Sequence, residues 1–76
     1  MVETGLENVY VFKTNISSDE DVSVIKTILN RHTAVKSWNV DREDVDRVLR
    51  VKSDTLKEEE IIHLITQFGF ICRELV

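Results

Sequence analysis

The chain has 76 residues, 42% of them hydrophobic and 32% charged, which is typical of one folded domain and excludes an intrinsically disordered chain. Ten basic and fourteen acidic residues give a net charge of −4, which disfavours binding to nucleic acid or to an anionic membrane surface. The single cysteine, Cys72, excludes an internal disulfide and an all-cysteine zinc site within one chain.

The N-terminal end lacks a basic patch followed by an apolar stretch, and the chain has no apolar run of about 18 residues. We therefore expect neither a secretory signal nor a membrane span, and a cytoplasmic location. We expect a single domain over residues 1–76, with residues 1–7 as a flexible N-terminal segment.

Residues 8–15 are rich in β-branched and aromatic types and predict a first strand. A period of two places one set of side chains on one face, namely Tyr10, Phe12, Thr14 and Ile16. The opposite face receives Val9, Val11 and Lys13.

A helix is predicted after this strand. Ser17 with Glu20 fits the spacing of a capping box, and Ser18 with Asp21 is a weaker variant of it. Apolar residues then recur at helical spacing, namely Val22, Ile25, Ile28 and Leu29. We expect the helix to end near residues 30–32.

Two strands are predicted next, over residues 35–41 and 46–52, joined by a turn at residues 42–44 into a hairpin. The first should contain an irregularity, because Val35 and Trp38 do not share a period of two; Trp38 is expected in the core. For the second strand, the pattern leaves open whether Leu49 with Val51 or Val48 with Arg50 faces the core.

The strongest periodic signal predicts a second helix. Thr55 with Glu58 fits a capping box, and Gly69 is placed to terminate the helix. The apolar stripe between them consists of Ile61, Ile62, Leu64, Ile65 and Phe68. A closing strand is predicted over residues 70–75.

The element order βαββαβ predicts an α+β fold, a ferredoxin-like sandwich. Right-handed crossovers then place both helices on one face of a four-stranded antiparallel sheet, with strand order 4-1-3-2.

Several segments in this order resemble the heavy-metal-associated domain, the fold of small copper chaperones and of modules of metal-transporting ATPases. They are Phe12-Lys13-Thr14-Asn15-Ile16, Val22 to Leu29, Ala34 to Asp41, Glu59-Glu60-Ile61-Ile62 and Gly69-Phe70. The resemblance covers about residues 9–75 and implies the same fold.

The chain departs from that family at its signature loop, Gly-Met-x-Cys-x-x-Cys. In the register set by Ile25, the family's two cysteines fall on Ser18 and Asp21, and its methionine falls on Ile16. Copper(I) and zinc in such a loop need thiolate ligands, and neither a hydroxyl nor a lone carboxylate replaces them. The family's metal-transfer chemistry therefore does not carry over to these positions.

Two other groups of side chains are candidate metal ligands. The first is Asp19-Glu20-Asp21, which offers carboxylate oxygens to a hard cation. The favoured interpretation is an acidic first turn of a helix, because negative charges there complement the helix dipole. The second is His32, His63 and Cys72, which have no ligand spacing; here a capping histidine, a surface histidine and a buried thiol are the favoured interpretation.

Catalysis and RNA binding are both disfavoured by the residues present. The chain has no phosphate-binding glycine loop and no Gly-x-Ser-x-Gly motif, and Cys72 has no evident base, so we expect no enzyme activity and no cofactor. The same fold binds RNA in RNA-recognition motifs through exposed aromatic residues, but here that sheet face carries aliphatic residues such as Val9 and Val11.

The leading functional hypothesis is a small non-enzymatic binding module that has lost the thiolate metal site. Its interaction candidates are Val9, Val11 and Phe70, and its partner is either another protein or a second copy of the chain. One alternative is heavy-metal binding or transport through non-cysteine ligands. Another is a small-molecule sensor with the same topology, such as an amino-acid-sensing ACT domain, although the first loop lacks the glycine that those often use.

Overall fold

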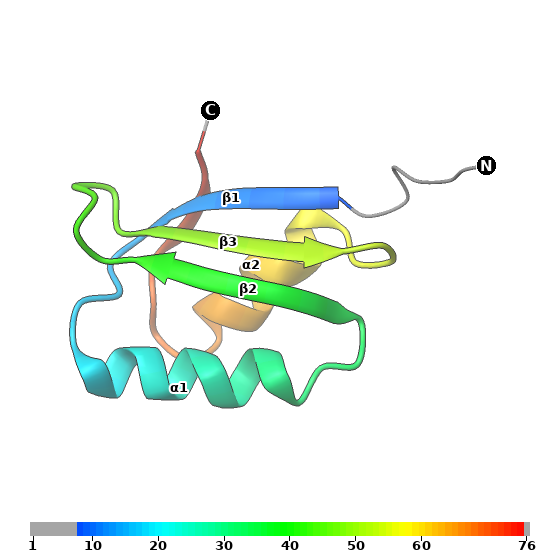
Figure 1. Cartoon of the computed structure of the whole chain (residues 1–76), viewed down its shortest axis with the longest axis horizontal. Helices are drawn as coiled ribbons and strands as arrows, with labels where there is room; N and C mark the ends of the chain where they lie inside the picture. Colours follow the sequence, from blue (N-terminus) through cyan, green and yellow to red (C-terminus); the bar gives the residue numbers. More distant parts are fainter. Residues whose placement is uncertain (1–7, 76) are drawn as a thin grey trace.

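The computed structural model describes residues 8–75, which form one four-stranded antiparallel sheet with two helices packed on one of its faces (Figure 1). The elements are β1 (Asn8–Thr14), α1 (Asp19–Asn30), β2 (Val35–Asp41), β3 (Val48–Ser53), α2 (Glu58–Thr66) and β4 (Cys72–Glu74). The spatial order β2-β3-β1-β4 is the predicted order viewed from the other edge, so the ferredoxin-like α+β fold is confirmed. The predicted flexible segment 1–7 lies outside the described residues.

The core lies between the sheet and the helices. Phe12, Thr14 and Ile16 are buried and Tyr10 is half-buried, which confirms the predicted inner face of β1. The strand phase that the sequence left open is now determined, because Leu49 and Val51 belong to this core and Arg50 is exposed. The remaining members of the buried cluster are Ile25, Leu29, Leu56, Ile61, Ile65 and Cys72.

The irregularity predicted in β2 is present as a register shift between Val35 and Ser37. It brings Trp38 opposite Val51, on the helix side of the sheet, where the indole ring packs against the core while staying half-buried. The indole N–H donates to Asn30 Oδ1 at 2.9 Å, so the ring also ties β2 to the end of α1.

Of the two capping boxes predicted at the start of α1, the structure has the weaker variant. Ser18 is the N-cap and pairs with Asp21, so the first choice, Ser17 with Glu20, is wrong. Both serines satisfy the local chemistry of a cap. The choice depends on packing, because a helix that begins at Asp19 points Ile25 and Leu29 into the core.

The predicted N-cap of α2, Thr55, lies two residues before the observed one, Lys57, so this prediction is wrong. The helix begins at Glu58, after Lys57, whose backbone N–H donates to Glu60 Oε1 at 2.7 Å. Thr55 lies in a preceding turn, in which the Ser53 hydroxyl accepts the backbone N–H groups of Thr55 and Leu56 at 3.2 and 3.0 Å. That turn buries Leu56, and the helix therefore starts later than the capping pattern predicts.

One residue of the predicted apolar stripe of α2, Phe68, does not lie in the core. The helix stops at Thr66, so Phe68 no longer lies on its apolar face and is 56% exposed. Gly69 follows with φ +92°, a left-handed conformation that glycine adopts without strain, which confirms its predicted role in terminating the helix.

Two strands are shorter or shifted relative to prediction. β3 begins at Val48 and not at residue 46, because Arg47 has a φ of +47°, which is incompatible with a strand. β4 is only Cys72–Glu74, since the Ile71 N–H donates to Asn15 Oδ1 instead of to a neighbouring strand. Among residues 8–75, neither helix has the length and apolar character needed to cross a membrane.

Candidate functional site

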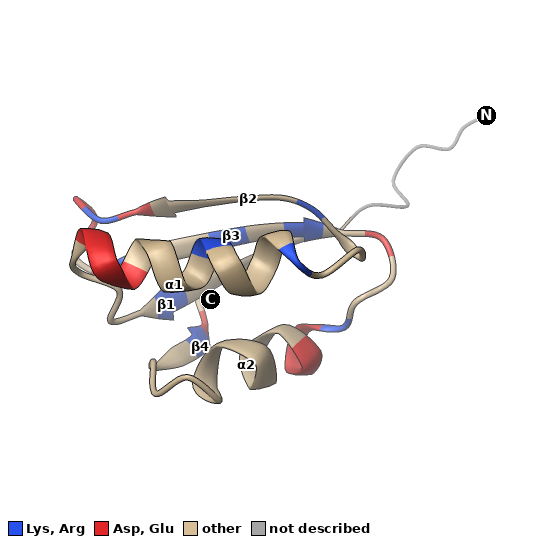
Figure 2. Ribbon diagram, turned by 90° about the horizontal axis from the view of Figure 1, so that it is seen from below, with Lys and Arg blue, Asp and Glu red and all other residues tan. Residues whose placement is uncertain are grey.

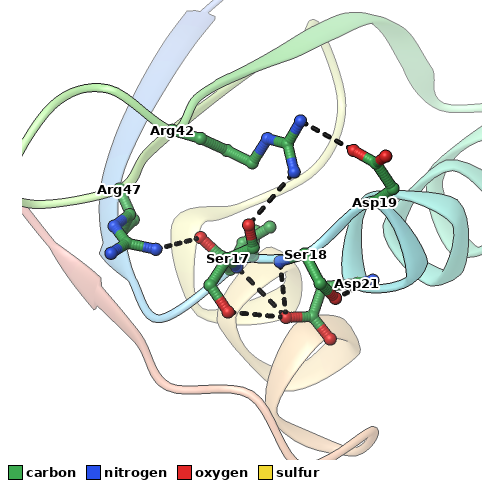
Figure 3. Close-up of polar contacts among 7 residues, drawn as sticks. Ser17, Ser18, Asp19, Asp21, Arg42 and Arg47 are labelled. Atoms are coloured by element: carbon green, nitrogen blue, oxygen red, sulfur yellow. Dashed lines mark hydrogen bonds and ion pairs between the residues drawn. The ribbon is translucent and has the colours of Figure 1, made fainter.

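The β1–α1 loop, residues 15–18, lies where the resemblance to the heavy-metal-associated domain would place a metal loop. Asp21 Oδ2 accepts three hydrogen bonds there, from the backbone N–H of Ser17 (3.1 Å), the Ser17 hydroxyl (3.2 Å) and the backbone N–H of Ser18 (3.2 Å). In return, the Ser18 hydroxyl accepts the Asp21 N–H at 3.0 Å. The side chains at positions 18 and 21 therefore satisfy the loop and the helix start, as Figure 3 shows.

The hydrogen bonds from the backbone N–H groups of Ser17 and then Ser18 lower the pKa of Asp21 below its ordinary value of 3.8. The side chain is thus a carboxylate at neutral pH, and one of its oxygens is surrounded by donors belonging to the loop itself.

Two arginines from the β2–β3 connection, residues 42–47, hold the other side of the loop (Figure 3). Arg42 donates to the carbonyl of Ser17 at 3.0 Å and to Asp19 Oδ1 at 2.8 Å. Arg47 donates to the carbonyl of Ile16 at 3.3 Å. Their two positive charges raise the electrostatic cost of placing a cation beside this loop.

Loss of the N-cap tests this description of the loop. We expect Ser18→Ala to lower the free energy of unfolding by about 1 kcal/mol, because the Asp21 N–H loses its acceptor. Ser17→Ala is the matched control and should cost roughly half or less, since its exposed hydroxyl caps no helix. Urea denaturation measures both values; equal losses for the two variants would contradict the assignment of Ser18 as the cap.

The three carboxylates considered for a hard cation have different partners. Asp19 forms an ion pair with Arg42 at 2.8 Å, Asp21 binds the loop backbone, and Glu20 is exposed. Among residues 8–75, no three histidine, cysteine, aspartate or glutamate side chains gather in a geometry that could hold a metal ion.

The structure brings His32 and His63 together but leaves Cys72 apart from them. Both histidines line an open depression of about 340 Å³ between the end of α1 and α2, together with Leu56, Glu59, Glu60 and Leu64. Cys72 is instead 5% exposed in the core. Burial, and then the charge of Glu58, raises the pKa of its thiol to about 12, so the thiol stays protonated at neutral pH and is a poor nucleophile and ligand.

The carboxyl groups of Glu58 on α2 and Glu74 on β4 interact with each other. The pKa of Glu58 is raised above its ordinary value of 4.5 by desolvation, then by the charge of Glu74 and a hydrogen bond to it. A raised pKa in the folded state favours the protonated form, so the pair supports folding at acid pH and loses that contribution as pH rises through the pKa of Glu58.

The Glu58–Glu74 pair should make the stability of the fold depend on pH. We expect Glu74→Gln to raise the melting temperature at pH 7, because it removes a like charge beside Glu58, and the gain should shrink as pH falls through the pKa of Glu58, where protonation of Glu58 removes the repulsion. Scanning calorimetry across this pH range measures the effect. Glu43→Gln, on the exposed β2–β3 connection, is the control, and an equal gain for this variant would contradict the explanation.

The sheet face opposite the helices is the second candidate site, and we call it the open face. On β1 it carries Val9, which is 55% exposed, and Val11, which is half-buried. The strand register places Lys52 opposite Val9 and Arg50 opposite Val11 on β3. These aliphatic and basic side chains form neighbouring rows.

Further side chains extend the open face to both edges of the sheet. Arg73 of β4 lies opposite Lys13, and Ser37 and Asn39 of β2 lie opposite Lys52 and Arg50. An open depression of about 330 Å³ is formed there, with Val9, Arg50 and Lys52 among its lining residues.

The sequence pattern located Val9, Val11 and Lys13 on this face but not Arg50 and Lys52, since the phase of β3 was open. Arg50 and Lys52 follow at once from the burial of Leu49 and Val51. The third interaction candidate, Phe70, is half-buried and packs against the core; the aromatic residue that is mainly exposed is Phe68.

No protein-family model matches the chain, and no curated protein matches it either. Its function is therefore inferred from its own fold, from the β1–α1 loop and from the open face.

Proposed function

We propose that the protein is a small non-enzymatic binding module, similar to the heavy-metal-associated domain, that has lost the thiolate metal site and contacts a protein partner through its open face. The observation that carries this proposal is the closure of the β1–α1 loop on itself, in which the side chains of Ser18 and Asp21 are engaged in capping.

The geometry at the two positions supports the family resemblance. A hydrogen bond of 3.0 Å joins the Ser18 hydroxyl to the backbone of Asp21, so these positions lie side by side, as two metal ligands would have to. Ile25, which sets the register of the resemblance, is fully buried in α1, as an apolar position of the family's first helix should be.

The loss of metal binding is supported by what the loop contains. Thiolates are replaced by a hydroxyl and a carboxylate, and the carboxylate already accepts three hydrogen bonds. The guanidinium groups of Arg42 and Arg47 bind the carbonyls of Ser17 and Ile16, which adds positive charge beside the loop and disfavours a cation there.

The open face supports a binding role. Neither helix covers it, and it combines the exposed aliphatic Val9 with the half-buried Val11 and several long basic side chains. Aliphatic residues on an uncovered surface, bordered by charged ones, are the usual composition of a protein contact.

A metal titration tests the proposal. We expect copper(I) or zinc at micromolar concentration to leave the amide NMR signals of residues 15–21 unchanged in the full chain. The double variant Ser18→Cys/Asp21→Cys is the positive control, because it supplies two neighbouring thiolates and should bind copper(I) in a one-to-one complex. Stoichiometric metal capture by the unaltered chain at this loop would overturn the proposal and favour metal binding or transport through non-cysteine ligands.

A further inference from the structure

The charge of the open face identifies the kind of partner. Resting on the proposed function, we infer that the open face binds an extended, acidic segment of another protein, with carboxylates on Arg50, Lys52 and Arg73 and an aliphatic side chain against Val9 and Val11. The chemistry of the partner is thus a stretch of alternating Asp or Glu with aliphatic residues.

The face is basic although the molecule as a whole is acidic. Four of the ten lysines and arginines point to it from three adjacent strands, namely Lys13, Arg50, Lys52 and Arg73. Six of the twelve acidic residues among residues 8–75 lie instead in the first turns of the two helices, which carry Asp19, Glu20 and Asp21 on α1 and Glu58, Glu59 and Glu60 on α2 (Figure 2). Four more lie on the β2–β3 side, at positions 41, 43, 44 and 46, so the charge asymmetry holds for the middle of the sheet face and not for its rim at this connection.

Most of these cations have no acidic partner within the part of the chain that the structure describes. Among residues 8–75, Arg50, Lys52 and Arg73 form no ion pair, whereas Lys13 lies 3.6 Å from Asp46. Arg50 and Lys52 are neighbours on β3, and Arg73 lies on the other side of β1. Together these exposed charges attract an anionic partner and repel a cationic one.

The spacing of the side chains favours an extended segment. Val9 and Val11 lie two residues apart on β1, and Lys52 and Arg50 stand opposite them on β3, so aliphatic and basic groups repeat with the period of a strand. An extended chain that lies on its edge between these two rows directs its alternate side chains to opposite sides, so acidic side chains meet the basic row and aliphatic ones meet the valines.

A protein segment fits this face better than a nucleic acid does. Unpaired bases bind sheet faces by stacking on aromatic rings. Here the aromatic residues of the strands are on the other side, since Tyr10 and Phe12 lie on the inner face of β1 and Trp38 packs against the core. The open face instead offers the aliphatic Val9 and Val11.

The test uses the full ¹⁵N-labelled chain and a synthetic peptide of about eight residues that repeats Glu-Val-Asp-Thr, which spans roughly 26 Å when extended. We expect it to shift the amide signals of Val9, Val11, Arg50 and Lys52, and to bind at least about tenfold more weakly when NaCl is raised from about 0.05 to about 0.5 M. A peptide in which lysine replaces each acid should not bind.

Two variants separate this face from general charge effects. Arg50→Glu/Lys52→Glu reverses two exposed charges on β3 and should abolish peptide binding. The matched control, Lys26→Glu/Lys57→Glu, makes the same change in net charge at exposed sites on α1 and just before α2, and should retain binding within about threefold. Equal weakening by both pairs would overturn the inference.

Three further outcomes also overturn it. One is no peptide binding at all, and another is an oligouridylate that competes with the peptide at equal concentration, which would indicate a general anion site or a nucleic-acid surface. The third is a mass near twice 8.8 kDa in light scattering that is lost in Val11→Asp, which would identify the occupant as a second copy. In that last case the open face remains a protein contact surface, so the proposed function stands while the acidic partner is rejected. Metal capture at the β1–α1 loop, or nucleic acid bound to the open face, rejects the proposed function.

Discussion

Phe12→Ala is expected to lower the free energy of unfolding by about 3–5 kcal/mol. Phe12 is fully buried in the centre of the core, where its ring stacks on Tyr10 with the centroids 6.4 Å apart. Alanine at this position loses the buried area and leaves a cavity between the sheet and the helices. A domain of this length has a total stability of about 4–11 kcal/mol, so the loss removes from about a quarter to all of it.

Phe68→Ala is the matched control, because it deletes the same ring from a residue that is 56% exposed. We expect a loss below about 1 kcal/mol. Urea denaturation followed by Trp38 fluorescence measures both variants. Comparable losses would mean that Phe68 lies in the core, as the helical periodicity predicted, and that α2 extends beyond Thr66 in solution.

Thr14→Val should produce the second-largest loss, about 2–4 kcal/mol, although the two side chains have nearly the same shape. Thr14 is 5% exposed, and its hydroxyl donates to the carbonyl of Arg47 and accepts the Ile16 N–H at 3.2 Å. Valine leaves both of these backbone groups without a partner. The hydroxyl thus joins the start of the β1–α1 loop to the left-handed turn at Arg47.

Thr66→Val is the control for this prediction, since the exposed hydroxyl of Thr66 donates only to the His63 carbonyl of its own helix, and we expect a change within about 0.5 kcal/mol. The amide signals of Ile16 and Arg47 should also move in Thr14→Val. A neutral effect on stability would contradict the hydrogen bonds that we assign to Thr14.

The location of the candidate sites could be predicted from the sequence only in part. The family resemblance placed Ser18 and Asp21 in the loop between a strand and a helix, and their spacing fits a capping box, as the structure has it. Arg42 and Arg47 could not be assigned to that loop, because they come from a connection about 25–30 residues further along the chain. Only the packing of the β2–β3 hairpin beside β1 brings them there.

What the sequence determined by itself is the order and type of the elements and the strand order of the sheet. The order and type follow from short-range periodicity: Tyr10, Phe12, Thr14 and Ile16 alternate at a period of two, and Ile61 and Ile65 recur at a helical period. The strand order then follows from the right-handedness of the two crossovers. Gly69 similarly marks its own position, because a left-handed residue after a helix favours glycine.

The tertiary structure alone decided where the helices begin and which face of β3 is buried. Ser17 and Ser18 can both cap a helix, and the local pattern favours Ser17, which the structure does not use. Val48, Leu49 and Val51 are similarly hydrophobic, so local preference cannot choose between the two phases of β3. The choice is made by burial: Leu49 and Val51 fill the space between β1 and the helices, which turns Arg50 and Lys52 outward beside Val9 and Val11. The basic open face is therefore a consequence of core packing, because a shift of one residue in a strand moves every side chain to the opposite face.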